Sequence, residues 1–277
     1  MSGPLNEWIQ LILRWTHVFA GILWVGTTYY FTWLDGRFTE LENAAKQAGD
    51  KGEGAEKHIW MVHSGGFYVV EKQKSPTVMP GKLHWFKWEA AITWLSGLLL
   101  FAMIYYHGKQ IVDFEDAKMP VVTAMFVSLG LIIAGWVVYD LLWSSKLFAN
   151  ELVGACVSYV LIVATTYGLF HWFSSRAAPI QLGAMLGTIM TANVWMRILP
   201  PQRRMVRALN EGRQPDLTEG ARAKMRSKHN TFIVIPVVFT MISNHFPTVT
   251  YGSRYNWIIV SALVLAGWGA AKVLRRA

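Results

Sequence analysis

The sequence predicts an all-α fold, a polytopic membrane helix bundle with about seven transmembrane helices. Of its 277 residues, 53% are hydrophobic, and long apolar stretches recur along the chain. Each is long enough, as a helix, to cross a hydrocarbon core of about 30 Å. The basic residues are concentrated in alternate connections between these stretches. The predicted spans are 7–34, 84–106, 120–143, 150–173, 178–200, 231–247 and 255–274.

The first span carries two polar side chains in its first third, Arg14 and His17. It starts at the polar pair Asn6-Glu7 and lacks the basic leader of a signal peptide, so we expect a retained helix. Arg14 and His17 are three residues apart and share one face of that helix. A charged side chain near the bilayer centre costs about 2.5–3.5 kcal/mol, so this face is expected to meet a partner rather than lipid.

Two connections are long, and both are expected on the cytoplasmic side of a single integral membrane domain, 1–277. Loop 35–83 opens with a helical stretch, "RFTELENAAKQAG", and its segments "FYVV" and "PTVMP" predict a short hairpin. Loop 201–230 follows Pro200-Pro201, which we expect to end the fifth span, and contains a turn at "RQPD".

The orientation follows from the positive charges. With the N-terminus outside, the inner connections carry 19 Lys and Arg residues and the outer connections carry 4. This asymmetry predicts an N-terminus outside and a C-terminus inside. The net charge of +9 thus reflects topology and contact with membrane lipid, and we expect no nucleic acid partner. The expected location is a bacterial inner (cytoplasmic) membrane, which the chain crosses several times.

The deepest of the eight histidines, His17, is a candidate haem ligand. It lies about 13 Å below Trp8 at 1.5 Å per residue, and neutral imidazole is a good iron ligand. Ala20 and Gly21 follow on its face and leave space for a flat macrocycle, while Arg14 suits a propionate. These features predict one or two b-type haems. The alternative is a structural His17 that bonds a backbone carbonyl of a neighbouring helix.

For the second axial ligand we prefer His245, in "MISNHFP", with His171 as the weaker candidate. Both side chains suit the membrane–water interface as well, which is the alternative for each. His229 and His245 are unsuited to holding two stacked haems on one helix, because 16 residues place them about 160° apart. The single cysteine, Cys156, excludes an internal disulfide and a C-x-x-C-H haem attachment.

A second polar layer is expected near the cytoplasmic surface, where groups from five helices converge. Ordinary charge at helix ends is the alternative interpretation. The stretch "LHWFKWE" interleaves charged groups with three aromatic rings, which suits a planar, anionic heterocycle. The residues of this layer are His84, Lys87, Glu89, Asp140, Glu151, Arg197, Lys228, His229 and Asn230.

Five stretches together resemble the membrane domain of the membrane-bound urate hydroxylases, the N-terminal part of a cytochrome-fused urate oxidase. They are "RWTHVFAGILWVGTTYYF", "HSGGFYVVEKQ", "LHWFKWEAAITWLSG", "ANVWMRILPPQR" and "KHNTFIVIPVVFTMISNHFPTVTYG". The resemblance implies hydroxylation of urate to 5-hydroxyisourate, with electrons passed to a c-type cytochrome rather than to dioxygen. Relatives of that type carry a further helix and a C-terminal cytochrome c domain, which these 277 residues do not contain. We therefore expect a separate electron acceptor, a c-type cytochrome or a quinone.

These observations together predict a haem-dependent membrane oxidoreductase that hydroxylates urate. The alternatives are a protoporphyrinogen-oxidising or quinone-linked cytochrome b and a haem-free transporter. The expected catalytic residues are His84, His229 and Lys87, and the expected substrate-binding residues are Arg197, Trp85, Phe86, Trp88, His63 and Glu89. The expected cofactor-binding residues are His17, His245, Arg14 and His171, with His17 and His245 on the iron.

Overall fold

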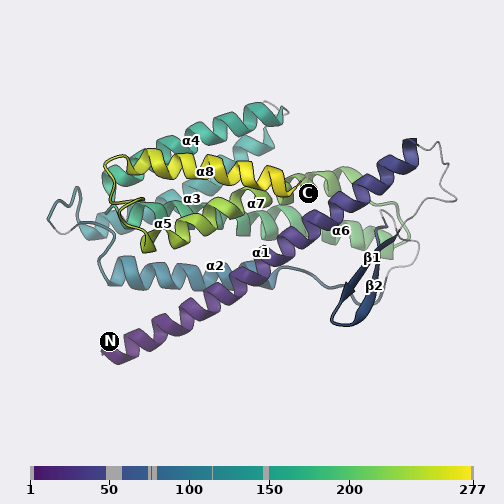
Figure 1. Cartoon of the computed structure of the whole chain (residues 1–277), viewed down its shortest axis with the longest axis horizontal. Helices are drawn as coiled ribbons and strands as arrows, with labels where there is room; N and C mark the ends of the chain where they lie inside the picture. The colour runs from purple at the N-terminus through teal and green to yellow at the C-terminus, as the bar shows by residue number, and fades with distance from the viewer. Residues whose placement is uncertain are drawn as a thin grey trace.

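The computed structural model describes residues 3–47, 58–73, 76, 80–113, 115–145 and 150–275. Most of the long helices lie roughly parallel in one bundle, and a two-stranded hairpin lies at one end (Figure 1). The helices are α1 (Gly3–Gln47), α2 (Trp88–Phe101), α3 (Val121–Ser144), α4 (Glu151–Trp172), α5 (Ala177–Ala192), α6 (Leu199–Asn210), α7 (Leu217–Ile242) and α8 (Asn256–Leu274). The shorter elements are strands β1 (His58–His63) and β2 (Gly66–Glu71), the π-helical segments η1 (Ala102–His107) and η3 (Asn193–Ile198), and the 3₁₀ turn η4 (Ser243–His245).

The all-α prediction is confirmed. In the described part of the chain, six continuous helical segments are long and apolar enough to cross a membrane. The expected sixth span, in α7, is not among them, because the first half of this helix is polar and basic. Its apolar second half nevertheless packs inside the bundle, against α5 and α8. The six segments are α1, α2 with η1, α3, α4, α5 with η3 and α6, and α8.

Helix α1 joins the first predicted span and the helical stretch after it into 45 continuous residues. At 1.5 Å per residue it is about 68 Å long, roughly twice the thickness of a hydrocarbon core. It crosses the side of the bundle and continues past it toward the hairpin (Figure 1). Its apolar half packs on α2, and most of the remaining surface of that half is exposed.

The expectation that Pro200-Pro201 ends the fifth span is wrong. Helix α5 continues through η3 into α6, and both prolines lie in the first turn of α6. Proline is tolerated there because the backbone N–H groups of a first helical turn need no partner within the helix. The π-helical segment before them also breaks the regular hydrogen-bond ladder. The predicted turn follows, and Asp216 then caps α7 by accepting from the backbone N–H of Thr218 over 2.8 Å.

The predicted hairpin is only partly confirmed. Its "FYVV" strand is β2, but the partner is β1, His58–His63, rather than "PTVMP". Residues 77–79 of that second segment lie outside the described residues. A turn at Ser64-Gly65, with φ of 50° and 77°, joins the strands. Two central residues with positive φ give a turn whose twist matches that of the paired strands, so β1 is the favoured partner.

The two ends of the bundle differ, and their contents agree with the predicted alternation of connections. The hairpin and α6 lie at one end, which we call the hairpin end (Figure 1). The opposite end contains the start of α1 and three connections. These connections join η1 to α3, α4 to α5, and α7 to α8. The core lies between them, with α5 at its centre, because 11 of the 16 residues of α5 are buried.

Candidate functional site

A cluster of charged side chains lies at the hairpin end of α3, α5 and α7, centred on Asp140. The Asp140 carboxylate accepts from Arg197 Nε over 2.8 Å and from Arg226 Nη2 over 3.0 Å. The same Arg226 nitrogen lies 3.0 Å from the Ser144 hydroxyl. Buried charges are stable only when paired in this way. Two guanidinium groups face one carboxylate, so the cluster carries an excess positive charge.

Arg226 is the most enclosed member of this cluster. Its side chain is only 5% exposed, and its guanidinium carbon lies 5.0 Å from the centre of the Tyr139 ring. Within the described residues, its Nη1 atom is buried and has no hydrogen-bond partner. A buried donor without a partner costs about 1–3 kcal/mol, and more when it is charged. This atom can therefore donate to an anion or a carbonyl oxygen that enters the cluster.

A chain of hydrogen bonds runs beside Arg226, from a backbone carbonyl to His229. Asn230 Nδ2 donates to the Met190 carbonyl oxygen over 3.1 Å, and Asn230 Oδ1 accepts from Asn193 Nδ2 over 2.9 Å. Asn193 Nδ2 also donates to the Tyr139 hydroxyl oxygen over 2.9 Å. That oxygen lies 2.8 Å from His229 Nδ1.

The direction of this chain suits one tautomer of His229. A backbone carbonyl only accepts, so Asn230 and then Asn193 must turn their NH₂ groups as described. Tyr139 therefore accepts a hydrogen bond from Asn193, and its own proton can be donated to Nδ1 of His229. A neutral imidazole that accepts at Nδ1 carries its proton on Nε2. The His229 ring also lies against Trp143, with 4.1 Å between ring centres.

Asn193 offers a second unpartnered atom in the same place. The residue is fully buried, and within the described part of the chain its Oδ1 has no hydrogen-bond partner. The cluster thus contains a cationic donor on Arg226 and a neutral acceptor on Asn193. Both residues contact the Tyr139 side chain. This pairing suits a ligand that carries both a negative charge or carbonyl oxygen and a ring N–H group.

The aromatic stretch before α2 forms a separate group. Lys87 Nζ lies 5.3 Å from the centre of the Trp88 ring and 5.7 Å from that of Trp195. Phe86 contacts both His84 and Phe31 edge to face, with ring centres 4.4 Å and 5.0 Å apart. These contacts join the second span to α1 and η3.

The two groups lie on different sides of η3. Trp195 faces Lys87, whereas Asn193 and Arg197 reach Tyr139 and Asp140. Residues two apart on a helix do not share a face. Of the residues predicted from sequence, the structure therefore brings Arg197 and His229 together, while Lys87, Trp85, Phe86 and Trp88 surround the other side of η3.

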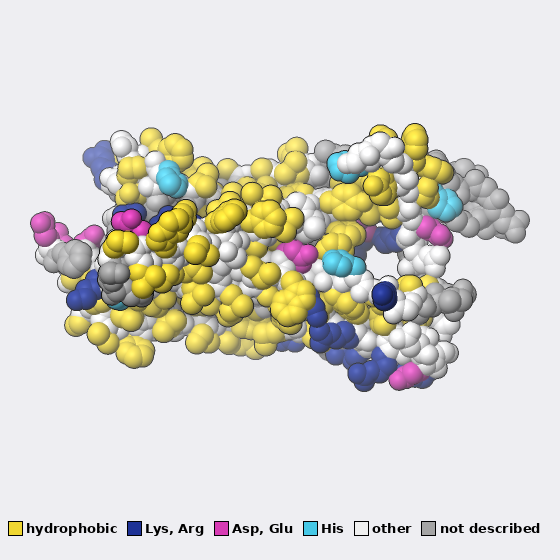
Figure 2. Space-filling view, turned by 90° about the horizontal axis from the view of Figure 1, so that it is seen from below, with side chains coloured by type: hydrophobic (Ala, Val, Ile, Leu, Met, Phe, Trp, Pro, Cys, Tyr) yellow, Lys and Arg dark blue, Asp and Glu magenta, His cyan; other side chains and the backbone are white. Residues whose placement is uncertain are grey.

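The remaining predicted residues lie toward the surface. His63 ends β1 beside the hairpin turn and is exposed, and Glu89 is half-buried in the first turn of α2. Seen from below, the hairpin end is hollowed, and histidine and basic side chains border the hollow (Figure 2). Lys228, predicted in this layer, pairs with Glu151 of α4.

Sequence reasoning missed Tyr139, Asn193 and Arg226 as site residues. Asn193 is a polar residue inside an apolar span, which is a signal that the sequence offers. Arg226 lies among other basic residues of α7, and only the packing of α7 on α3 and η3 shows that this one is buried.

The candidate haem ligand His17 lies between α1 and α2. Its Nδ1 is 2.8 Å from the Thr93 carbonyl oxygen, which is the contact foreseen as the alternative to iron ligation. Its ring covers Gly97, where an added Cβ would lie 2.8 Å from His17 Cε1. An imidazole that donates from Nδ1 to a carbonyl keeps its Nε2 lone pair, and ligating histidines are commonly held in this way. The Nε2 atom of His17 is therefore suited to bind iron.

The small residues after His17 do not leave the space that was expected. Ala20 is buried, and Gly21 faces Thr93 of α2, with 3.8 Å between an added Cβ and the threonine methyl group. Helix α2 fills this face of α1 because small side chains let the two helices approach closely. A macrocycle bound by His17 would have to lie elsewhere around the ring.

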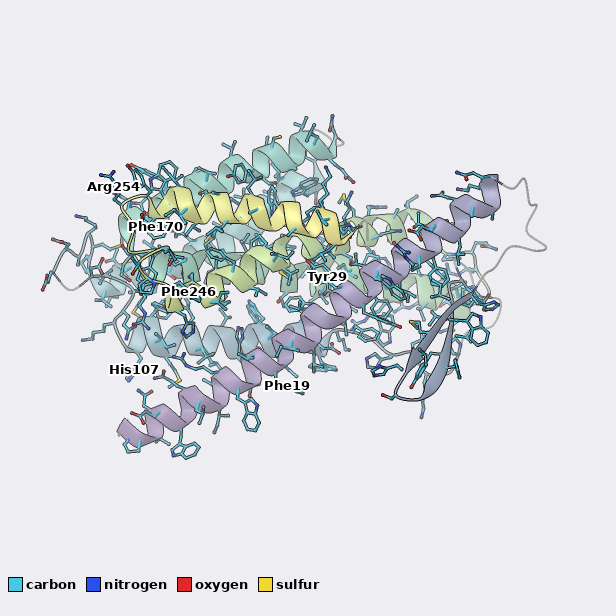
Figure 3. The ribbon with its side chains drawn as sticks, viewed as in Figure 1. Phe19, Tyr29, His107, Phe170, Phe246 and Arg254 are labelled. Atoms are coloured by element: carbon cyan, nitrogen blue, oxygen red, sulfur yellow. The ribbon has the colours of Figure 1, made fainter. Side chains whose placement is uncertain are left out.

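The other predicted haem residues lie at the end of the bundle away from the hairpin. His245 is exposed in η4, and its neighbour Asn244 donates to the Tyr105 hydroxyl over 2.8 Å. Figure 3 shows Phe246, which follows His245, and His107 at this same end. The turn that carries His245 thus lies beside η1, which continues α2, and α2 packs on α1.

His171 is placed differently. It lies near the end of α4, where it stacks on Tyr167 at 6.5 Å with an interplanar angle of 5°. Helix α4 packs against α8 and α5, across the bundle from α1 (Figure 1). Of the two proposed second ligands, His245 is therefore the better placed.

The fold and these contacts define a class, an integral membrane helix bundle with a buried cationic cluster at one end. The chain belongs to the urate oxidase N-terminal family, whose model matches residues 3–275. A search of the curated proteins finds no match, and neither does a search of the solved structures. The family match connects the chain with urate oxidation.

Proposed function

We propose that the protein is a haem-dependent membrane oxidoreductase that hydroxylates urate to 5-hydroxyisourate. The observation that carries the proposal is that buried Arg226 and buried Asn193 both contact Tyr139 and each carry an unpartnered polar atom, Nη1 and Oδ1 respectively. Membership of the urate oxidase N-terminal family supports urate as the substrate. The electrons pass to a separate acceptor, a c-type cytochrome or a quinone.

Urate recognition follows from the charges of the cluster. Urate is planar and anionic at neutral pH, and its ring alternates carbonyl oxygens with N–H groups. Arg226 Nη1 donates to a urate oxygen, and Asn193 Oδ1 accepts from a ring N–H. Arg197 and Arg226 exceed Asp140 by one charge, which the anion neutralises.

The aromatic group, on the other side of η3, is the surface that the anion meets before it reaches this site. Lys87 supplies a cation between two indole rings, and Trp85, Phe86 and Trp88 supply flat apolar surface. Such surfaces hold a planar anion on its way from the cytoplasmic side. His84, His63 and Glu89 belong to the same approach, where their polar groups meet water.

The reaction releases two protons as well as two electrons. Urate and one water give 5-hydroxyisourate, two protons and two electrons, so the site needs a proton acceptor. We infer that the Tyr139 hydroxyl donates its proton to His229 Nδ1, which lies 2.8 Å away. As Tyr139 takes a proton from the attacking water, it passes its own proton to His229. His229 is thus the base for one of the two protons, which Tyr139 relays to it, and the second proton leaves to solvent water.

The proposed haem supplies an acceptor for single electrons. His17 would hold its iron through Nε2, because the Thr93 carbonyl fixes the proton of this ring on Nδ1. His245 would be the second ligand, with His171 as the weaker candidate, and Arg14 would pair with a propionate.

The experiment compares purified wild-type protein with Arg226→Ala. Urate is added without oxygen together with an artificial electron acceptor, and urate loss and 5-hydroxyisourate are followed by absorbance. We expect a fall in turnover of about 10²-fold or more, because a charge-assisted contact of about 3 kcal/mol is lost. The control is Arg203→Ala, which removes an exposed arginine from α6. Unchanged turnover in Arg226→Ala, or hydrogen peroxide formed in proportion to urate, would contradict the proposal.

A further inference from the structure

The hairpin has one face that nothing covers in the described part of the chain. The strand register pairs Trp60 with Val69 and Val62 with Phe67, so these four side chains share one face. Their exposed fractions are 64%, 48%, 70% and 80%, respectively. We call this surface the hairpin apolar face. Four large apolar side chains together on a water-facing hairpin require an apolar or interfacial partner.

The position of the hairpin along α1 indicates what this partner is. The opposite hairpin face, with Ile59, packs on Leu34 and Phe38 of α1. The Tyr30 hydroxyl lies 3.5 Å from the Met61 sulfur. Since the apolar segment of α1 ends at Leu34, the hairpin lies at the level where this helix leaves the hydrocarbon.

The surface next to the hairpin has the composition of a membrane interface. Tyr30, Phe31 and Trp33 of α1 are all more than one-third exposed, and they continue the apolar surface toward the hairpin. Tyr and Trp are enriched where a protein meets lipid headgroups. Figure 2 shows hydrophobic side chains along the bundle and again at the hairpin end.

We propose that the hairpin apolar face inserts into the headgroup region of the leaflet at the hairpin end. The occupant of this face is thus the lipid surface, rather than a second copy of the chain or another protein. The charge of this end is complementary, because Lys82 and the α6 residues Arg203 and Arg207 are basic and this end carries most of the positive charge. Basic side chains at this level attract anionic headgroups.

Insertion of the hairpin also bears on the helices that hold the polar cluster. Asp35 of α1 pairs with Lys72, the residue after β2, and with Lys224 of α7, whose Nζ lies 2.7 Å from the carboxylate. One carboxylate therefore ties the hairpin to α1 and to the helix that carries Arg226. A hairpin held by lipid fixes the position of this junction relative to the membrane.

The test uses nitroxide labels on single cysteines in the full chain. The native Cys156 is replaced by alanine, and cysteine is introduced at Val62, Phe67 or, as a matched control, at exposed Gln73 beyond β2. The proteins are reconstituted in vesicles of phosphatidylethanolamine and phosphatidylglycerol. Collisions of each label with oxygen, which partitions into lipid, are compared with collisions with a water-soluble nickel chelate.

We expect the ratio of oxygen to nickel accessibility to be several-fold higher at positions 62 and 67 than at position 73. Equal ratios at the three positions would overturn the proposal. Dipolar coupling between labels on two copies at position 62 or 67 would also overturn it, because a second copy would then cover the face. Val69→Cys replaces either variant that fails to purify as a single species. The readout needs neither urate nor haem, so its failure is distinct from failure of the proposed function.

Discussion

Tyr139→Phe tests the hydrogen-bond chain, because it deletes one oxygen and leaves the ring in place. That oxygen accepts from Asn193 and, in the proposed arrangement, donates to His229 Nδ1. The buried Asn193 N–H then loses its partner at a cost of about 1–3 kcal/mol, and the half-buried His229 nitrogen adds less. We expect a destabilisation of about 2–4 kcal/mol in total and a loss of about 10²–10⁴-fold in urate turnover, the usual contribution of a positioned proton acceptor.

Nitrogen-15 NMR of histidine-labelled protein reads the tautomer directly, with His229→Gln assigning the signals. We expect the Nε2–H tautomer in the wild type and a mixture of tautomers in Tyr139→Phe. Tyr167→Phe is the control, since Tyr167 is exposed on α4 and, among the described residues, its ring contacts His171 and Trp257. A wild-type His229 with its proton on Nδ1 would refute the reasoning, and so would a Tyr139→Phe protein that keeps both the tautomer and the turnover.

Two further variants test the charged cluster and the candidate haem ligand. Asp140→Asn leaves two guanidinium groups without their carboxylate. We expect the free energy of unfolding in denaturant to fall by about 3–5 kcal/mol. The control is Asp113→Asn at an exposed position, which we expect to leave this free energy unchanged. A stability equal to that of the wild type in Asp140→Asn would show that the pairing is unimportant. Gly97→Ala places a methyl group 2.8 Å from His17 Cε1 and displaces the imidazole ring. The control is Gly187→Ala, whose added Cβ meets nothing within 4 Å. We expect Gly97→Ala to contain less haem than this control, measured as pyridine haemochrome. Equal haem content in these two variants would remove His17 from the cofactor site.

Six of the seven predicted spans correspond to segments that are long and apolar enough to cross a membrane, and they were predictable because apolar length alone indicates them. The third predicted span, 120–143, differs from α3, Val121–Ser144, by one residue at each end. The continuation of the helix through Pro200-Pro201 was not predictable in the same way. It depends on where the first turn of α6 begins, and that is determined by the π-helical segment before it.

The site was predictable only as a layer of polar residues near one membrane surface. Residue depth places Arg197 and His229 in that layer, and the structure joins them through Asp140, Arg226 and Tyr139. The sequence does not reveal which way η3 turns, so the separation of Lys87 from Asn193 could not be foreseen. For His17, a backbone carbonyl partner was foreseen, but Thr93 could not be identified because carbonyl groups are present at every residue.

The central claim is that urate gives its electrons to this membrane bundle through the cluster around Arg226. The most direct measurement adds urate to oxidised, purified protein without oxygen or any added acceptor and records the haem spectrum. The account predicts that a reduced α-band appears as urate is consumed, and that Arg226→Ala shows neither change at the same urate concentration. A wild-type spectrum that stays oxidised while dithionite still reduces it would contradict the account, as would full reduction by urate in Arg226→Ala.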